Sequence, residues 1–477
     1  MNYSPFKRLL LAAALCLVAL TGLAQGKAKY VFYFIGDGMG VNQVNGTETY
    51  LAALEGRIGT TPLCFADFPA SALVTTFSGT NGVTDSAAAG TALATGHKTK
   101  NGALGLLADL ATPIYSVAVS AKENGAAVGV ATSVSIDHAT PAAFYAHVGY
   151  RGEYYKIGTQ LPKTGFDYFG GSDFLKPTDK DNPGAPDLYA QCEKAGYVIA
   201  RGYKDFKKKM RKAEKIILFQ TETAAKENPT ALPYAIDRKK GDLTLQDITR
   251  AGIGQLSKSE RDGKGFFFMV EGGKIDWACH SNDAATVFHE VKDFDEAIRV
   301  AYEFYCQHPD ETLIVVTADH ETGGIALGCG PYELHTDAFK YQRMSTEAYS
   351  RHLSALRQSG KAFTWELVER DLAENWGFGK GVTLSEGQIS RLKKAFDALA
   401  AGTAEQSKSL YASADALADT ARAILAECAL VGWKSGGHSN GYVPLFAIGA
   451  GSELFNGRID NTEIPRRIAK AAGWEMK

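Results

Sequence analysis

Acidic and histidine side chains follow three strongly apolar runs of this chain. They are Asp37 after residues 29–35, Glu271 after residues 266–270, and Asp319 and His320 after residues 312–317. Such runs predict strands buried on both faces of a parallel sheet, and parallel strands end at one common edge. Carboxylate oxygens and imidazole nitrogens are ligands of divalent metal ions. The sequence therefore predicts a metal site at that edge.

A second group of metal-binding residue types has helical spacing. Asp276 and His280 are four residues apart, which places both side chains on one face of a helix. A surface ion pair at a helix start explains that spacing about equally well. His438 lies in a Gly/Ser loop before another apolar run, residues 443–448, and we expect it at the same sheet edge. His335 is the alternative third ligand.

Ser86 is the candidate nucleophile. It follows Asp85 in the stretch VTDSAAAGTALATG (residues 83–96), whose small side chains predict a closely packed helix. A hydroxyl group at a helix N-terminus faces unpaired backbone N–H groups, a site that suits an oxyanion such as phosphate. The simpler explanation is that Ser86 only caps the helix.

Thr140 and Arg151 flank a further expected helix. Pro141 suits the first position of that helix, which would place Arg151 about three turns beyond Thr140. In a phosphate site an arginine binds non-reacting oxygens through two parallel hydrogen bonds. A lone arginine at such a position is otherwise a solvated surface residue.

Several function classes are disfavoured. The glycine-rich loop after residues 29–35 has Val41 where a dinucleotide-binding loop needs its third glycine, and Asp37 would repel a pyrophosphate. His97 separates Gly96 from Lys98, so that stretch is not a phosphate-binding P-loop. The 477 residues carry a formal net charge of −2, which gives no reason to expect nucleic acid or an anionic membrane as a partner.

The N-terminus has the pattern of a signal peptide. Lys7 and Arg8 precede the short apolar run 9–20, and small residues follow it, so we expect cleavage after Ala24. The mature protein is then exported, to the periplasm or beyond, without a membrane anchor. Six cysteines remain after cleavage, and their wide spacing allows no pairing to be deduced.

The expected fold is α/β, with a central, mostly parallel sheet that has helices on both faces. We expect residues 25–477 to form a single domain, with residues 158–265 peripheral to the main sheet. Residues 331–432 are expected to be a helical insertion without strands. Its predicted helices are 346–358, 364–374, 384–400 and 413–429.

Together these side chains predict three ion sites. The sets are Asp276, His280 and His438 for a zinc ion with an open position; Asp37, Asp319 and His320 with Ser86 for a second zinc ion; and Thr140 and Glu271 with a bridging Asp37 for a magnesium ion.

The chain resembles bacterial alkaline phosphatases. The resemblance rests on FIGDGMG (34–40), VTDSAAAGTALATG (83–96), DHATPAAFYAHVGYR (137–151), VEGGKIDWACH (270–280), TADHETGG (317–324) and GGHSNGYVPLFAIGAG (436–451). It implies two zinc ions and one magnesium ion on the ligands above, with Ser86 as nucleophile and Arg151 binding phosphate. It further implies phosphate monoesters as substrates, inorganic phosphate as product, and a homodimer.

His138 and Trp277 occupy positions that vary within this family, near the expected magnesium and phosphate sites. In the best-known bacterial form these two residues are acidic and basic. Alternative functions are a phosphodiesterase or sulfatase of the same superfamily, and a catalytically silent metal- and phosphate-binding protein. Ser86 lacks the Cys-x-Pro-x-Arg context of a sulfatase, and a silent protein would have lost its nucleophile or its ligands.

Overall fold

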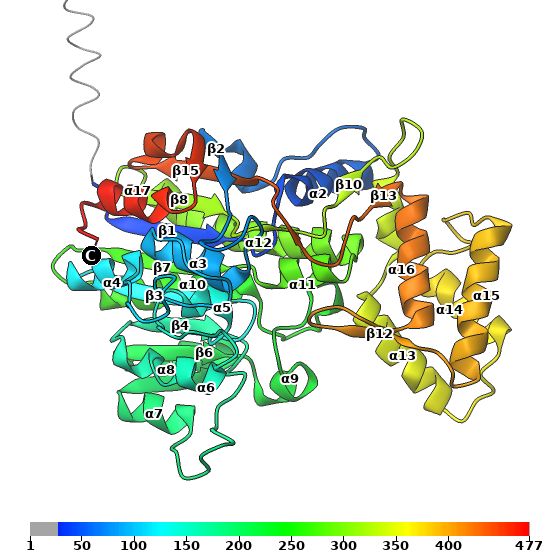
Figure 1. Ribbon diagram of the computed structural model, residues 1–477, viewed down its shortest axis with the longest axis horizontal. Helices are drawn as coiled ribbons and strands as arrows, with labels where there is room; N and C mark the ends of the chain where they lie inside the picture. The colour runs from blue at the N-terminus through cyan, green and yellow to red at the C-terminus, as the bar shows by residue number, and fades with distance from the viewer. Residues whose placement is uncertain (1–26, 477) are drawn as a thin grey trace, which may run out of the picture.

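A ten-stranded sheet forms the centre of the computed structural model, which describes residues 27–476 (Figure 1). The strand order is β16-β2-β15-β8-β1-β7-β3-β4-β6-β5. The strands are β1 (Tyr30–Ile35), β2 (Ala70–Thr75), β3 (Ala127–Thr132), β4 (Tyr168–Gly171), β5 (Tyr197–Arg201), β6 (Lys215–Phe219), β7 (Phe266–Glu271), β8 (Thr312–Thr317), β15 (Val443–Gly449) and β16 (Gly457–Asp460). Only β15 is antiparallel to its neighbours, so the expected mostly parallel sheet is confirmed.

Helices cover both faces of this sheet, as predicted. Alternate side chains of β1 point to opposite faces: Phe32 and Phe34 contact Phe304 and Phe294 of α12, while the Tyr33 hydroxyl donates to the carbonyl oxygen of Leu93 in α3. Helices α2 (Val41–Leu54), α10 (Leu245–Ser259) and α12 (Ala284–Gln307) pack together on the first face. Helices α3 (Ser86–Thr95), α4 (Val117–Glu123), α5 (Ala139–Ala142) and α17 (Glu463–Ala472) pack together on the second.

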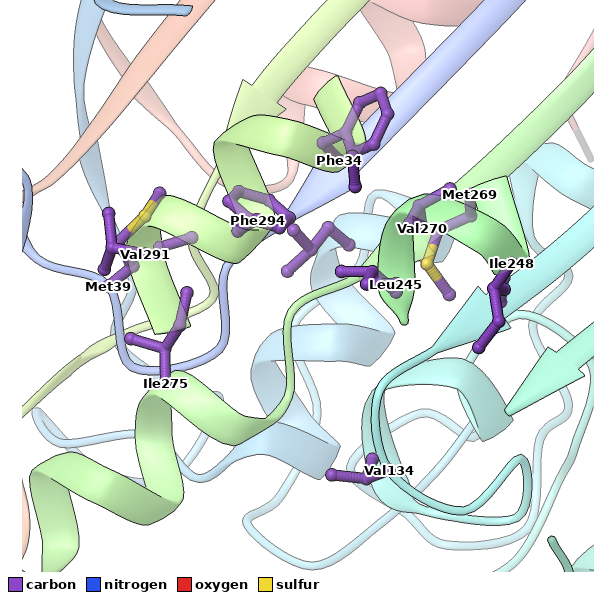
Figure 2. Close-up of a cluster of buried hydrophobic side chains, with 14 of the residues drawn as sticks. Phe34, Met39, Val134, Leu245, Ile248, Met269, Val270, Ile275, Val291 and Phe294 are labelled. Atoms are coloured by element: carbon purple, nitrogen blue, oxygen red, sulfur yellow. The ribbon is translucent and has the colours of Figure 1, made fainter. Parts of the chain in front are cut away.

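The hydrophobic core lies between the sheet and these helices. Every residue of β1, β3, β7 and β8 is buried, which explains why these strands have continuous apolar runs rather than alternation. Figure 2 shows part of the core, where Phe34 of β1 lies beside Val270 of β7 and faces Phe294 of α12. A sheet fixed on both faces holds the ends of its central strands in one rigid arrangement.

Residues 158–265 are not peripheral to the sheet, which corrects the expectation above. They supply three strands, β4, β6 and β5, that extend it at one end. These strands are only four or five residues long, and β4 ends in two glycines, so their apolar pattern is too short to distinguish from a loop. The connecting helices are α6 (Tyr154–Gly158), α7 (Leu188–Lys194), α8 (Tyr203–Lys209) and α9 (Glu222–Glu227).

The insertion, residues 331–432, contains the expected helices but also strands. Its helices are α13 (Thr346–Gln358), α14 (Trp365–Asn375), α15 (Glu386–Ala400) and α16 (Ala416–Cys428), and they stand beside the sheet in Figure 1. Strands β11 (Gln406–Lys408) and β12 (Ser413–Asp415) form a hairpin, and β13 (Val431–Gly432) pairs with β10 (Ala326–Leu327). The predicted helix 413–429 begins later because Asp415 caps α16, accepting from the N–H groups of Leu417 and Ala418.

The predicted signal peptide, residues 1–24, lies outside the described residues. Within residues 27–476, none of the helices is long and apolar enough to cross a lipid bilayer. That residues 25–477 form one domain stays a prediction.

Candidate active site and metal centre

Four of the predicted metal-binding side chains lie at the carboxyl ends of three adjacent strands. Strand β1 lies between β7 and β8. Asp37 follows β1 by two residues, Glu271 is the last residue of β7, and Asp319 and His320 follow β8. All four side chains are fully buried. Because these strands are neighbours in the sheet, acidic groups from distant parts of the chain lie close together.

Ser86 is the first residue of α3, and it is not the helix cap. That role belongs to Asp85, whose carboxylate accepts the backbone N–H of Ala88 at 3.0 Å. The Ser86 hydroxyl instead lies 3.1 Å from Nε2 of His320. The simpler explanation, that Ser86 only caps the helix, is thus wrong, because its neighbour Asp85 is the cap. The serine hydroxyl is directed at the acid and histidine groups.

Helix α3 approaches α5 closely at Gly90. A Cβ atom at Gly90 would lie 3.3 Å from both the Cα atom of Thr140 and the Cβ atom of Ala143. Such contacts are tighter than most Cβ contacts, so any larger residue here would require its neighbours to move by a few tenths of an ångström. The close approach brings Ser86 on α3 and Thr140 on α5 to the same part of the site.

His438 reaches the site because of the direction of β15. This strand is antiparallel to β8, so the segment before it lies where β8 ends. There, β14 (His438–Ser439) pairs with β9 (Glu321–Thr322), which directly follows His320. The pairing places the two histidine rings face to face, with centroids 3.6 Å apart.

Asp276, His280 and His438 converge on one point. Helix α11 (Lys274–His280) places an oxygen of Asp276 3.2 Å from Nε2 of His280, and the Nε2 atoms of His280 and His438 are 3.2 Å apart. Nδ1 of His280 lies 2.6 Å from the carbonyl oxygen of Gly436, and Nδ1 of His438 lies 2.8 Å from that of Thr84. Each Nδ1 has a backbone carbonyl oxygen as its partner, which directs both Nε2 atoms toward the same point as the Asp276 carboxylate. Two imidazole nitrogens and one carboxylate around one point can bind a cation.

Two further groups of three residues have the same geometry. One consists of Asp37, Asp319 and His320, and the other of Asp37, His138 and Glu271; in every group the ligand atoms lie within 4.8 Å of one another. The third group contains Asp37 and Glu271 of the predicted magnesium set and adds the imidazole of His138. Thr140 is buried beside Glu271, whose pKa its hydroxyl lowers.

The site contains many buried polar atoms without a hydrogen bond. They are both Oδ atoms of Asp37, Nδ1 of His138, Oγ1 of Thr140, Oε1 of Glu271, Oδ2 of Asp276 and Oδ2 of Asp319. Buried polar groups in proteins nearly always have partners, and each unsatisfied one costs about 1–3 kcal/mol. Such a concentration of unpaired carboxylate and imidazole atoms fits bound divalent cations.

The carboxylates also repel one another. Burial, reinforced by the Asp276 carboxylate, raises the pKa of Asp319 to about 8, and burial raises the pKa of Glu271 to about 7. Burial and the Asp319 carboxylate likewise raise the pKa of Asp37 well above its usual range. Without cations, protons are therefore retained on groups that are ordinarily ionised at neutral pH.

This charge balance predicts that a divalent cation, tested as zinc, stabilises the protein more at pH 8 than at pH 6. A carboxyl group with a raised pKa contributes stability that is complete below its unfolded-state pKa and is lost as the pH rises through its folded-state pKa. The metal-free protein therefore loses this stability toward pH 8, whereas a bound divalent cation pairs with the ionised carboxylates. We expect the difference in Tm with and without zinc to grow by about 2–5 °C between pH 6 and pH 8. Thermal melts at both pH values check this, and a difference that stays constant or shrinks contradicts it.

Arg151 lies in a turn, in contact with His138 of this cluster. Helix α5 ends at Ala142, so the three helical turns expected between Thr140 and Arg151 do not exist. The Arg151 guanidinium instead lies 3.3 Å from a carboxylate oxygen of Asp85 and 3.4 Å from Nε2 of His138. Its place beside Asp85, the residue before Ser86, is therefore set by tertiary contacts and not by helical spacing.

Sequence reasoning missed Tyr411. This residue lies in the hairpin of the insertion, and its hydroxyl accepts a hydrogen bond from Nη2 of Arg151 at 3.2 Å. Its ring stacks on Trp277, with centroids 4.5 Å apart and an interplanar angle of 11°. No motif surrounds Tyr411, so only the fold reveals its proximity. His335, the alternative metal ligand, lies elsewhere: it is half exposed and pairs with Glu333 at 3.1 Å.

A mostly parallel sheet with buried acid and histidine clusters and a serine at its carboxyl edge defines a metal-dependent hydrolase of the α/β class. A family model described as "Alkaline phosphatase" matches residues 28–173 and 190–474. The chain belongs to the alkaline phosphatase family, and it is accordingly a metal-dependent phosphomonoesterase. The resemblance identified from the sequence motifs is confirmed.

Individual relatives agree with this assignment. The chain is 30% identical to alkaline phosphatase 3 of Bacillus subtilis, over 99% of this chain and 98% of that protein. Among solved structures, the cold-active alkaline phosphatase from Shewanella sp. has a TM-score of 0.78 and 28% identity, covering 93% of this chain and 99% of that one. The Thermus thermophilus alkaline phosphatase has a TM-score of 0.75 and 27% identity, covering 95% and 93%.

A further structure is a mutant of the alkaline phosphatase from the Antarctic bacterium TAB5, in which a histidine is replaced by glutamate, with Mg bound in the M3 site. It has a TM-score of 0.63 and 25% identity, and the match covers 95% of this chain and 100% of that one.

Proposed function

We propose that this enzyme hydrolyses phosphate monoesters through a phosphoserine on Ser86, using two zinc ions and one magnesium ion. The observation that carries the proposal is the position of the Ser86 hydroxyl, at the start of α3 and 3.1 Å from His320 within the metal-binding groups. Asp276, His280 and His438 would hold one zinc ion. Asp37, Asp319, His320 and Ser86 would hold the other. Glu271 and Thr140, with Asp37, would hold the magnesium ion.

The proposed reaction has two steps. Oγ of Ser86 attacks phosphorus in line, the bond from phosphorus to the ester oxygen breaks, and the alcohol leaves with the proton. Water then cleaves the phosphoserine, which releases inorganic phosphate and restores the hydroxyl group. The Arg151 guanidinium and the Ser86 backbone N–H bind the non-reacting oxygens. When bound, the metal ions supply Lewis acidity, which favours the ionised serine and stabilises charge on the leaving oxygen.

The test compares initial rates on one aryl phosphate monoester and its matching diester, with zinc and magnesium and after chelation. We expect fast monoester hydrolysis that chelation abolishes and metal addition restores. A preference for the diester would retain the metal site but overturn the substrate class. Absence of turnover with zinc bound would point to the silent phosphate-binding alternative.

The identity of the third ion depends on His138. An imidazole nitrogen beside two carboxylates is a weaker match for magnesium, which prefers oxygen ligands, than an all-oxygen set. His138→Asp is therefore expected to lower the Kd of this site for magnesium several-fold, so that more magnesium is retained through dialysis, while zinc at the other two sites serves as the internal control. Elemental analysis after dialysis measures both. Magnesium content equal to that of the wild type would show that His138 does not face the ion.

We further propose that residues 1–24 direct export and are then removed, that the mature enzyme acts in the periplasm or outside the cell, and that it is a homodimer. The charged and apolar segments of the N-terminus support export. The family resemblance supports the dimer.

A further inference from the structure

The insertion touches the proposed phosphate site through one hairpin. Strands β11 and β12 run from the helices of the insertion toward α11 (Figure 1). Their connection is the turn Ser409–Ala412, closed by a hydrogen bond from the Ser409 N–H to the carbonyl oxygen of Ala412 at 2.9 Å. Leu410 at its tip is exposed, whereas Tyr411 is mostly covered. The hairpin thus turns one aromatic side chain inward.

Tyr411 fills the space between the phosphate-binding arginine and the aromatic residues of the metal site. Its ring stacks on Trp277 and meets His138 and His280 edge-on, with centroid distances of 5.8 and 5.5 Å. These contacts leave its hydroxyl beside Nη2 of Arg151, at 3.2 Å. The ring is held by stacking, so the position of the hydroxyl is determined independently of the arginine.

Both ends of the hairpin are anchored to other elements. At the tip, the hydroxyl groups of Ser409 and Ser281 are 3.1 Å apart, and Ser281 directly follows His280 at the end of α11. At the base, the Asp415 N–H donates to the hydroxyl of Ser350 on α13 at 2.9 Å. The turn is therefore fixed to the same helix that carries Asp276 and His280.

We propose that Tyr411 is a positioning residue that holds the Arg151 guanidinium for phosphate binding. Through it, the insertion sets the affinity of the site for substrate and for inorganic phosphate. The inference rests on the proposed role of Arg151, but it assigns a function to a residue outside every motif of the site. A long arginine side chain loses rotamer freedom when it binds an oxyanion, and a preformed hydrogen bond reduces that loss.

The experiment is a double-mutant cycle on inhibition by inorganic phosphate. Tyr411→Phe keeps the stacked ring and removes only the hydroxyl. We expect its Ki for phosphate and its KM for an aryl phosphate to rise together by roughly 5–20-fold, with zinc content and Tm unchanged. Arg151→Ala is expected to raise Ki by at least as much. When Arg151 is already alanine, Tyr411→Phe is expected to change Ki less than about twofold.

Tyr349→Phe is the matched control. It removes a tyrosine hydroxyl from the same insertion, one that donates to Asp371 at 2.9 Å, and it is expected to leave Ki unchanged. The inference is overturned if Tyr411→Phe leaves Ki unchanged while Arg151→Ala raises it. It is also overturned if Tyr411→Phe has its full effect in the Arg151→Ala background. If Arg151→Ala itself leaves Ki unchanged, the proposed function of Arg151 fails first, and the inference fails with it.

Discussion

Replacing Ser86 with alanine is expected to lower kcat for phosphate monoesters by roughly three to five orders of magnitude. The alanine leaves no atom that can form the phosphoester bond. Asp37, Asp319 and His320 remain, so zinc content is expected to stay nearly intact. Helix α3 is expected to keep its start as well, because Asp85 and not Ser86 provides the cap. Initial rates and elemental analysis of the purified variant measure the two effects.

The phosphoserine intermediate can also be detected directly. Wild-type enzyme quenched in acid during turnover is expected to carry phosphate on Ser86, located by mass spectrometry of its peptides. Ser120→Ala, which replaces a buried serine of α4, is the control and is expected to keep both turnover and the phosphopeptide. Undiminished turnover in Ser86→Ala would end the covalent mechanism while leaving the metal site in place.

Replacing His438 with alanine is expected to lower zinc content from about two ions to about one per chain and kcat/KM by roughly 10²–10⁴-fold. His438 supplies one of the two Nε2 atoms that face each other 3.2 Å apart, with Asp276 close by. The group formed by Asp37, Asp319 and His320 does not include this residue, so its ion is expected to remain. Elemental analysis and initial rates at saturating zinc measure the losses.

His335→Ala is the matched control for this second prediction. His335 was the alternative ligand from sequence, but it is half exposed and paired with Glu333. We expect its variant to have wild-type zinc content and rate. If His438→Ala kept two zinc ions per chain and His335→Ala lost one, His335 and not His438 would be the third ligand. The insertion would then have to move to bring His335 to the site.

Much of the site followed from local patterns. A buried central strand must be apolar throughout, and a parallel sheet gathers the ends of such strands, so the positions of Asp37, Glu271 and Asp319 were predictable from the runs that precede them. The spacing of Asp276 and His280 similarly follows from helical geometry. Local patterns were weaker where strands are short, and for that reason β4, β5 and β6 went unrecognised.

The sequence alone determined where the buried central strands lie along the chain, which acidic and histidine residues follow them, and the family to which the chain belongs. The tertiary structure alone decided that Asp85 caps α3, that His138 joins Asp37 and Glu271, and that Tyr411 contacts Arg151 across 260 residues of sequence. The physical reason is the range of the interactions. Burial and helical periodicity act on neighbouring residues and mark the local sequence, whereas a contact between two distant loops depends on how the whole chain packs and leaves no local pattern.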